Sequence, residues 1–393
     1  MIKPLLVPVF LPSLLMSIAE YALLPVIPAS ALELGADIPT AALIAGLLMV
    51  GVLVADLPAG RLVDRLGERK SMILGAVLGA VGVLAVSLGH SLALMAIGVF
   101  ALGVGIAIFA LARHAFFAEH IPLEFRARSL SLLGGTFRGG AFAGPILGSV
   151  FISVWGVTSV YWLAGVTCVV AGAILFGSPK DVIKATPATK PGGIAAVAKR
   201  EAKSLLTLGI GAAILGAVRT TRQVGLPLWA LVIGLSPEET SLYIGIAGIL
   251  DFALFYTSGQ IMDRWGRFWA AVPPTIGLGI LHIFVFTAQD STGFLLLASA
   301  MALANGFGSG IILTMGADLA PADARNEYLA SYRLITDIGV AAAPPLLSAA
   351  AVWTGELSLA MSGFGVLGIF GGLLMWRYIP RFIPTPSRSG ERS

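Results

Sequence analysis

The chain has 393 residues, of which 57% are hydrophobic and 12% are charged, with a formal net charge of +4 and a mean hydropathy of +0.92. Water-soluble domains carry about 25% charged residues, so this composition excludes a soluble enzyme, a nucleic-acid-binding module and a disordered chain. The sequence predicts a polytopic membrane protein. Its 48 glycines favour a bundle of helices, because small residues allow transmembrane helices to approach closely.

Twelve apolar stretches are predicted to cross the membrane, since a helix needs about 20 residues to span the hydrocarbon core. The first stretch carries Glu20 and ends without a small-residue cleavage pattern, so we expect a membrane span and no cleavable signal sequence. In chain order, the predicted spans are residues 4–28, 40–60, 71–89, 92–113, 129–152, 157–177, 204–233, 241–261, 268–288, 294–315, 329–352 and 357–376.

The basic residues predict the orientation of the chain. Four of the 25 Lys and Arg residues lie inside predicted spans, and all the others fall on one side if the N-terminus is cytoplasmic. The connections on the other side carry acids, such as Glu33, Asp37 and Glu238. This positive-inside asymmetry predicts a multi-pass protein of the cell membrane with both termini in the cytoplasm.

Residues of the first half recur in the second half at a fixed offset of 199 positions. The matched pairs are Gly60 and Gly259, Asp64 and Asp263, Arg65 and Arg264, Gly67 and Gly266, Pro28 and Pro227, Pro122 and Pro321, Arg126 and Arg325, Gly140 and Gly339, Pro145 and Pro344, and Gly156 and Gly355. We therefore predict a parallel duplication with a pseudo-two-fold axis along the membrane normal. Its parts are an N-terminal six-helix half at 1–177, a cytoplasmic linker at 178–203, a C-terminal six-helix half at 204–377 and a cytoplasmic tail at 378–393.

The connection between the second and third spans carries a recognisable motif. The run from Gly60 to Lys70, GRLVDRLGERK, resembles the signature loop of the major facilitator superfamily. A shorter copy, from Gly259 to Arg267, lies between the eighth and ninth spans, as in that family. The resemblance implies an all-helical secondary active transporter with no enzymatic activity, whose two halves rock about a site near the membrane midplane.

The resemblance also implies a gating role for this loop. Its glycines permit a tight turn, and Asp64 is expected to pair with a basic residue or a helix end and so hold the two halves together in one state. A purely topogenic loop would explain the arginines but not the spacing of Gly and Asp. The gating residues expected on this basis are Asp56, Gly60, Asp64, Arg65, Gly67, Arg69, Gly259, Asp263, Arg264 and Gly266.

A second motif lies in the fifth span, at Gly140, Gly144, Pro145 and Gly148. It looks like part of the Gly-Pro motif of proton-coupled exporters in the same superfamily. Three positions depart from the pattern: Ser131 and Ser149 replace two of its glycines, and Val99 replaces a basic residue that many members carry in the fourth span. The alternative interpretation is a Gly-Pro kink that serves helix packing alone.

Ionisable residues inside the spans are candidates for function, because a charge in the membrane costs several kcal/mol. Under the repeat, Glu20 and Arg219 occupy equivalent positions in the two halves, and so do Arg138 and Asp337. The two residues of each pair carry charges of opposite sign. In the fold that the resemblance implies, the fifth and eighth spans face each other, so Arg138 is expected to meet Asp251. The expected proton-coupling residues are Glu20, Asp251 and Asp337. The expected cavity residues are Glu20, Arg113, Arg138, Arg219, Arg222 and Arg333.

The alternative is that these charges form fixed salt bridges that only hold the helices in register. The third, sixth, ninth and twelfth spans contain no Asp, Glu, Lys or Arg. In the fold implied by the resemblance, these four are the outer helices that face lipid.

Two functions remain open on the sequence alone. The first is export of small amphipathic compounds in exchange for protons, with Glu20 as the proton site, as in family exporters that place a protonatable acid in the first span. The second is a carrier, either importer or exporter, of an anionic metabolite. The spans contain four arginines but only three acids, Glu20, Asp251 and Asp337, and arginine binds carboxylates well. A membrane sensor or scaffold is the remaining alternative, and the short connections offer it no partner domain.

The sequence also predicts what the protein does without. The single cysteine, Cys168, has no partner for a disulfide, and the four histidines lack metal-ligand spacing. No nucleotide-binding loop or nucleophile triad is present in the sequence. We therefore expect no cofactor and no metal, with small-molecule substrate, protons and the lipid bilayer as partners, no nucleic acid, and a monomer.

Overall fold

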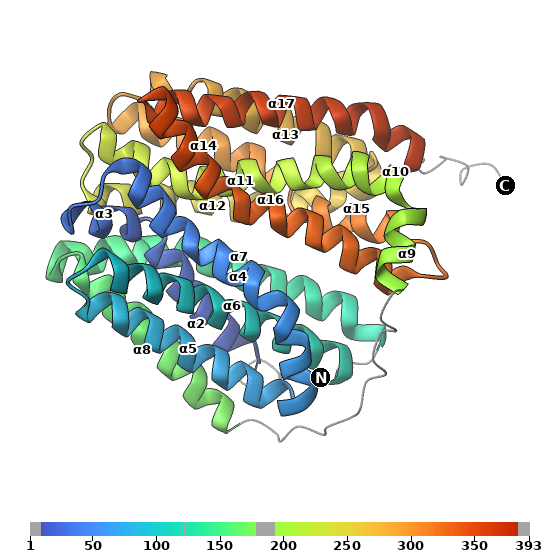
Figure 1. The fold of residues 1–393 in the computed structure, drawn as a ribbon, viewed down its shortest axis with the longest axis horizontal. Helices are drawn as coiled ribbons and strands as arrows, with labels where there is room; N and C mark the ends of the chain where they lie inside the picture. Colours follow the sequence, from blue (N-terminus) through green and yellow to red (C-terminus); the bar gives the residue numbers. More distant parts are fainter. Residues whose placement is uncertain (1–8, 121–122, 178–192, 384–393) are drawn as a thin grey trace.

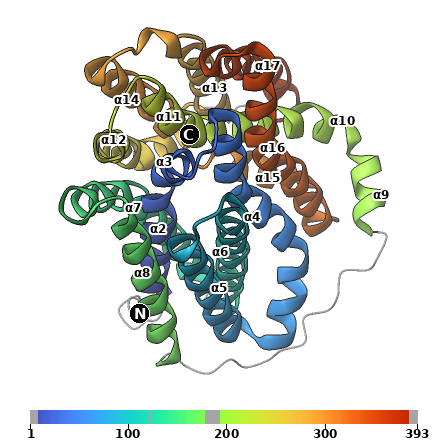
Figure 2. The ribbon, with the colours of Figure 1, turned by 60° about the vertical axis from the view of Figure 1, so that its left-hand side comes forward.

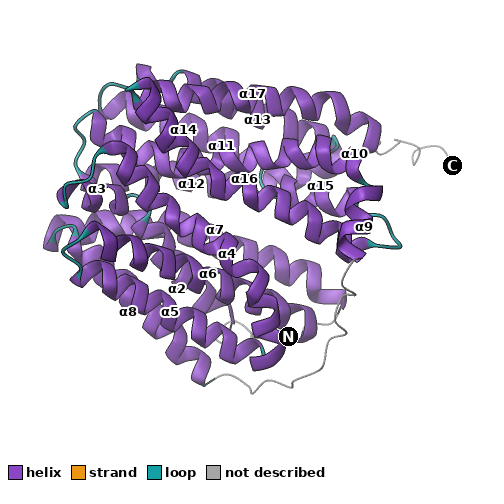
Figure 3. Ribbon diagram, viewed as in Figure 1, coloured by secondary structure: helices purple, strands orange, loops and turns teal. Residues whose placement is uncertain are grey.

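The computed structural model describes residues 9–120, 123–177 and 193–383, and within these residues the chain consists of helices and short connections (Figure 3). The helices of the first half are α2 (Leu11–Leu23), α3 (Val26–Glu33), α4 (Ile38–Leu66), α5 (Glu68–Leu88), α6 (Leu92–His120), α7 (Leu123–Trp155) and α8 (Thr158–Phe176). Those of the linker region and second half are α9 (Gly193–Arg200), α10 (Ala202–Ser204), α11 (Ile210–Val232), α12 (Pro237–Arg264), α13 (Arg267–Ile283), α14 (Ser291–Phe307), α15 (Ile311–Leu319), α16 (Arg325–Thr354) and α17 (Leu357–Phe382).

Some sequence expectations fall outside the described residues. They are the start of the first span at 4–8, Pro122 in the repeat, the linker at 178–192 and the tail at 384–393. The side chains of Arg126 and Ser131 lie in the same category. The boundaries of the two halves therefore stay predictions.

The all-helical architecture is confirmed, and the described helices match the expected count of twelve membrane spans in part. Ten of the described helices are long and apolar enough to cross a membrane, or eleven if α2 and α3 form one span bent by 43°. The ninth expected span, at 268–288, is α13, which has 17 residues and is followed by a short 3-10 turn at Val285–Thr287. The apolar composition continues past the end of this helix, so hydropathy overestimates its length.

The bend in the first span follows from its sequence. Pro25 lacks a backbone N–H and stands between the end of α2 and the start of α3, where it interrupts the hydrogen bonds of a continuous helix. The tenth span is interrupted in a different way, because Gly310 adopts a φ of +75° between α14 and α15. Only glycine enters this region without strain.

The helices form two bundles with the same internal contacts (Figures 1 and 2). In the first bundle α2 packs on α7 and α8, α5 packs on α6 and α8, and α4 packs on α6. In the second, α11 packs on α16 and α17, α13 packs on α14 and α17, and α12 packs on α14. Each contact of one bundle has its equivalent in the other, as a parallel duplication requires.

The backbone conformation repeats at the same offset. Three pairs of glycines, 199 positions apart, share a positive φ, which is the conformation that favours glycine. They are Gly35 and Gly234 (+89° and +80°), Gly67 and Gly266 (+84° and +90°), and Gly156 and Gly355 (+80° and +75°). The turns that connect equivalent helices are thus built alike in both halves.

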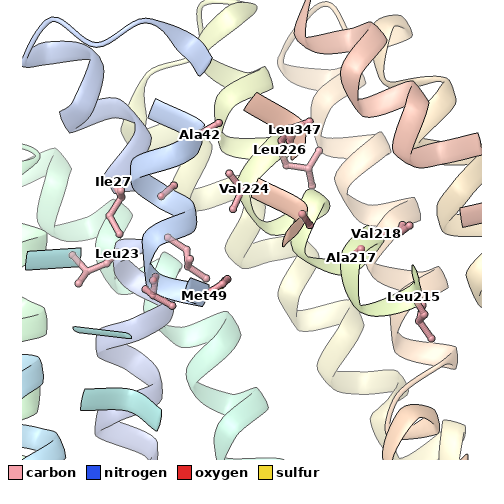
Figure 4. Packing of buried hydrophobic residues seen from close by; sticks show 14 of the residues in the cluster. Leu23, Ile27, Ala42, Met49, Leu215, Ala217, Val218, Val224, Leu226 and Leu347 are labelled. Atoms are coloured by element: carbon pink, nitrogen blue, oxygen red, sulfur yellow. The ribbon is translucent and has the colours of Figure 1, made fainter. Parts of the chain in front are cut away.

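Two helix pairs join the bundles, α7 with α12 and α4 with α16, and they are equivalent to each other under the repeat. At one end of the molecule α3 also contacts α11 and α12 (Figure 2). We call the opposite end, where α9 and the end of α17 lie (Figure 1), the linker end. Figure 4 shows buried apolar side chains on both sides of the interface, from Leu23 and Met49 in the first bundle to Val224 and Leu347 in the second.

The linker helix α9 is fixed to the second bundle. It packs against α16, and the guanidinium of Arg200 donates to both carboxylate oxygens of Asp323, at 2.7 and 3.1 Å. This contact holds the pKa of the Asp323 carboxyl below its usual range.

The outer helices α5, α8, α13 and α17 present apolar side chains on the surface, including Val81, Val166, Ile280 and Val366. These helices correspond to the four spans that carry no charge within the membrane. Their exposed apolar faces are what contact with lipid requires.

Glycines allow very close helix contact inside each bundle. A Cβ added at Gly75 would lie 2.6 Å from the carbonyl oxygen of Gly105, and one added at Gly279 would lie 2.7 Å from that of Gly365. At Gly103 the added carbon would overlap the carbonyl oxygen of Leu48 on α4. Backbone packs directly on backbone at these points. Such van der Waals contacts stabilise helix association in a membrane, where the hydrophobic effect does not.

Substitution of Gly103 by alanine is therefore expected to destabilise the protein by about 1–3 kcal/mol, because the backbones of α4 and α6 must separate. The matched control is Gly363→Ala on α17, where an added Cβ meets nothing within 4 Å. Thermal unfolding of the purified variants in detergent measures the difference. Equal melting temperatures for the two variants would contradict the close-packing argument.

Candidate functional site

A cavity of about 250 Å³ lies between the two bundles. Its walls come from α2 and α7 of the first bundle and from α11, α12 and α14 of the second. The charged residues that line it are Arg138, Arg219, Arg222 and Asp251. The cavity is thus bounded by residues of both halves.

Asp251 on α12 is the centre of the polar contacts in this cavity. Its Oδ1 accepts from Nη1 of Arg138 at 2.7 Å, and its Oδ2 accepts from Nη2 of Arg222 at 3.2 Å and from the amide of Asn305. The expected ion pair between Arg138 and Asp251 is thus confirmed. Arg138 belongs to α7 and Asp251 to α12, so this ion pair joins the two bundles.

Arg219 on α11 has no carboxylate partner among the described residues. Its Nη2 donates to the carbonyl oxygen of Gly308 at 2.8 Å, and its Nε–H is buried without an acceptor, as is the Nε–H of Arg222. The cavity therefore has three guanidiniums and a single carboxylate in its wall. Such an excess of buried positive charge attracts an anion, because an unpaired charge away from water is costly.

Aromatic rings also line the cavity, beside the charged residues. Tyr21 and Phe137 meet edge to face with centroids 5.4 Å apart, and Phe252 packs on Phe142 at 5.2 Å. The guanidinium of Arg138 lies over the ring of Phe255, 5.0 Å from its centroid. This arrangement suits a compact ligand with an apolar or aromatic body and a negatively charged end.

A second cluster of charges lies outside the cavity wall. Arg333 on α16 donates to Asp56 on α4 at 2.9 Å and to Asp337, one turn along α16, at 3.2 Å. The bond to Asp56 crosses from one bundle to the other. The sequence predicts that Arg333 lines the substrate cavity. In the structure it lies outside the described cavity wall and contacts these two acids instead.

Glu20 and Arg113 also lie outside the cavity wall. Glu20 is partly buried on α2, and no hydrogen bond or ion pair joins its carboxylate to a described residue. The charge of Arg113, which is buried on α6, acts on it through space. Tyr21, the next residue along α2, faces the cavity instead.

The two signature loops make contacts within their own halves. Gly67 and Gly266, both with positive φ, directly precede α5 and α13. Arg69 donates to the carbonyl oxygens of Leu175, at 2.7 Å, and Phe176 at the end of α8.

In the second loop, Arg267 lies 2.7 Å from Asp318 and 3.5 Å from Asp263. Gly60 approaches only a side chain of its own half, and an added Cβ at Gly259 meets nothing within 4 Å. Asp64, Arg65 and Arg264 are exposed. In this arrangement the bundles are bridged by Asp56 and Arg333, and the gating role of Asp64 stays a prediction.

The glycines of the fifth span have a clear packing role. An added Cβ at Gly140 would overlap Ser17, and one at Gly144 would lie 2.8 Å from the backbone of Ala22. Gly148 also approaches Ala22, at 3.6 Å from its carbonyl oxygen. Pro145 lines the cavity, so this motif brings α7 onto α2 and at the same time shapes the site.

Sequence reasoning did not single out Tyr21, Phe137, Asn305 or Gly308. Asn305 offered a signal, since it is an amide in an otherwise apolar span, and polar side chains in such spans usually bind another helix. The aromatic residues gave no signal, because apolar rings are common everywhere in membrane helices.

The two bundles, their cavity and the charges between them define a membrane carrier in which the site lies between symmetric halves. A model of the major facilitator superfamily matches residues 9–344, and the chain belongs to this family. Its membership identifies it as a transporter of this superfamily.

Solved structures share the fold over nearly the whole chain. A POT family transporter in complex with 5-aminolevulinic acid superimposes with a TM-score of 0.80 at 14% identity, over 95% of this chain and 96% of that one. A D-xylose-proton symporter gives a TM-score of 0.70 at 15% identity, over 98% of each chain.

Curated relatives match over shorter regions. The gallate transporter of Pseudomonas putida is 30% identical over 158 residues, 39% of this chain and 35% of the relative. The human solute carrier family 2, facilitated glucose transporter member 12, is 35% identical over 85 residues, 22% of this chain and 14% of the relative. The matched regions thus span about a third or less of these relatives.

The bridge between Asp56 and Arg333 is expected to appear as a coupling energy. Asp56→Asn and Arg333→Gln together should destabilise by less than the sum of the single changes, by about 0.5–1 kcal/mol, because each single change already removes the bond that joins the two side chains. Thermal unfolding of the four proteins measures the coupling. Asp56→Asn combined with the distant Arg267→Gln is the control and should be additive, and an additive result for the bridge itself would contradict the contact.

Proposed function

We propose that this chain carries small organic anions, whose carboxylate is bound by Arg138, Arg219 and Arg222. The observation that carries the proposal is the excess of guanidinium groups over carboxylates in the wall of a cavity between the bundles. Arg219 has no acid partner among the described residues and is the first group available to an incoming anion. Arginine suits this role because its planar fork binds carboxylates through two parallel hydrogen bonds.

The size and walls of the cavity support a narrower substrate class, small aromatic carboxylates. A volume of about 250 Å³ lies below the roughly 300–1,000 Å³ of pockets for drug-sized ligands. Tyr21, Phe137 and Phe252 can pack against a ring while its carboxylate meets the arginines. The similarity to a gallate transporter, whose named substrate is an aromatic carboxylate, points in the same direction.

The two ion pairs between the bundles suit a mechanism of alternating access. Arg138 with Asp251, and Arg333 with Asp56, each join one residue from either half. Rocking of the halves lengthens such bonds, and reforming them restores the starting state. We propose that the protein acts as a monomer in the cell membrane with the linker end in the cytoplasm, as the basic residues indicate.

Arg219→Gln is expected to weaken transport of gallate or benzoate by roughly tenfold to hundredfold in proteoliposomes. A hydrogen bond to a charged group contributes about 1.5–3 kcal/mol, and each 1.4 kcal/mol changes affinity about tenfold. The matched control is Arg377→Gln on the exposed end of α17. Wild-type activity in Arg219→Gln, or transport of neutral and cationic compounds only, would refute the proposal.

A second candidate is the export of amphipathic compounds in exchange for protons. It is favoured by Glu20, an acid inside the membrane that makes no ion pair with a described residue and so is available to a proton or a cation. The Gly-Pro motif on the adjacent α7 supports the same candidate. Its substrates would reach Glu20 only if the cavity extends beyond the wall described above.

This candidate is tested in inside-out vesicles with an acid interior, a pH-sensitive dye and a panel of cationic, neutral and anionic amphiphiles. Proton release on adding a compound is expected for the wild type and is expected to be lost in Glu20→Gln. Glu33→Gln, at the exposed end of α3, is the control and should behave as the wild type. Proton release that persists in Glu20→Gln would exclude Glu20 as the proton site.

A further inference from the structure

Asp251 occupies the position that the carboxylate of a transported anion would take. Its two oxygens accept hydrogen bonds from Arg138 of the first bundle and from Arg222 of the second. It is the single acid in the described wall of the cavity, where three arginines meet. An anion that binds both halves must reach Arg138, and Asp251 already holds that guanidinium at 2.7 Å.

The surroundings of Asp251 distinguish the bond to Arg138 from its other contacts. Arg222 on α11 and Asn305 on α14 belong to the same bundle as Asp251, and they move with it when the halves rock. Arg138 on α7 belongs to the other bundle. If a substrate takes over Arg138, Asp251 keeps two partners and is not left as an unpaired charge.

The other ionisable groups on the neighbouring helices cannot replace Asp251, because they either carry no negative charge or lie away from Arg138. Tyr21 on α2 lines the cavity but carries no charge. His282 on α13 is buried, with its Nδ1 bonded to the carbonyl oxygen of Leu278. Glu33 lies at the exposed end of α3. Glu20, the residue before Tyr21 on α2, lies outside the cavity wall. In the described wall, Asp251 is thus the single acid bonded to Arg138.

We propose that Asp251 is the resident anion of the carrier: it bridges the two bundles through Arg138 when the cavity is empty, and the carboxylate of the substrate replaces it there. The inference rests on the proposed function as an anion carrier and adds a statement about the empty state. Closing the cavity over three arginines without an anion would bury uncompensated charge, which is strongly unfavourable. Asp251 neutralises one of these charges in the empty carrier and so lowers the cost of changing its orientation.

A carrier whose empty form can reorient returns without substrate after each release, and so produces net transport of the substrate across the membrane. A carrier whose empty form cannot reorient exchanges one substrate molecule for another and nothing more. The resident anion therefore predicts net transport in the wild type. A substitution that removes the charge of Asp251 and keeps its shape is expected to abolish net transport and to leave exchange.

The experiment uses the full-length protein in proteoliposomes and radiolabelled gallate, with benzoate as the second probe. Net uptake is measured into empty vesicles, and exchange into vesicles preloaded with the unlabelled anion. The wild type is expected to show both, at rates within a few fold of each other. Asp251→Asn is expected to retain exchange and to lose net uptake by at least tenfold, and Glu238→Gln, at the exposed start of the same helix, should behave as the wild type.

The outcomes separate the two proposals. If the wild type moves neither anion in either assay, the proposed function fails and this inference fails with it. If the wild type exchanges but shows no net uptake, anion carriage stands and the resident-anion role is overturned without need of a variant. Net uptake in Asp251→Asn at the wild-type rate overturns it as well. Loss of both activities in a variant that melts as the wild type assigns Asp251 to substrate binding and also overturns the inference.

Discussion

The ion pair between Arg138 and Asp251 joins the two bundles in the wall of the cavity that lies between them. A charge inside a membrane needs a partner there, because water cannot solvate it. Here Arg138 finds its carboxylate partner in the other half of the molecule, while Asp251 also pairs with Arg222 of its own half. The same carboxylate therefore joins the two bundles and offsets positive charge in the cavity wall.

Glycines bring helices into close contact both inside the bundles and between them. Within each bundle they place helix backbones in direct contact. Between the bundles, a Cβ added at Gly46 would overlap Pro344, and one added at Gly245 would lie 3.0 Å from the backbone nitrogen of Ile146. The interface therefore combines close packing with the arginine ion pairs.

The sequence was sufficient for the fold class, through the repeat and the signature loops. It was also sufficient for the pairing of Arg138 with Asp251, because the family resemblance implied that the fifth and eighth spans face each other. It was not sufficient for the cavity wall. Neighbouring residues on a helix point about 100° apart, so whether Glu20 or Tyr21 faces the cavity depends on the rotation of α2. Which acid of α4 meets Arg333, Asp56 or Asp64, depends on the tilt between the bundles. Local sequence encodes neither rotation nor tilt.

The cationic groups of the cavity are unevenly shared between the bundles. Arg219 and Arg222 come from α11, while the first bundle supplies Arg138 together with the rings of Tyr21 and Phe137. Under the anion-carrier proposal, a ligand meets guanidiniums on both sides, with two of the three on the second bundle, so its charged end has a preferred place. The duplication that produced a symmetric scaffold thus carries an asymmetric site, and molecules of equal size and charge are expected to fit differently according to where the charge lies.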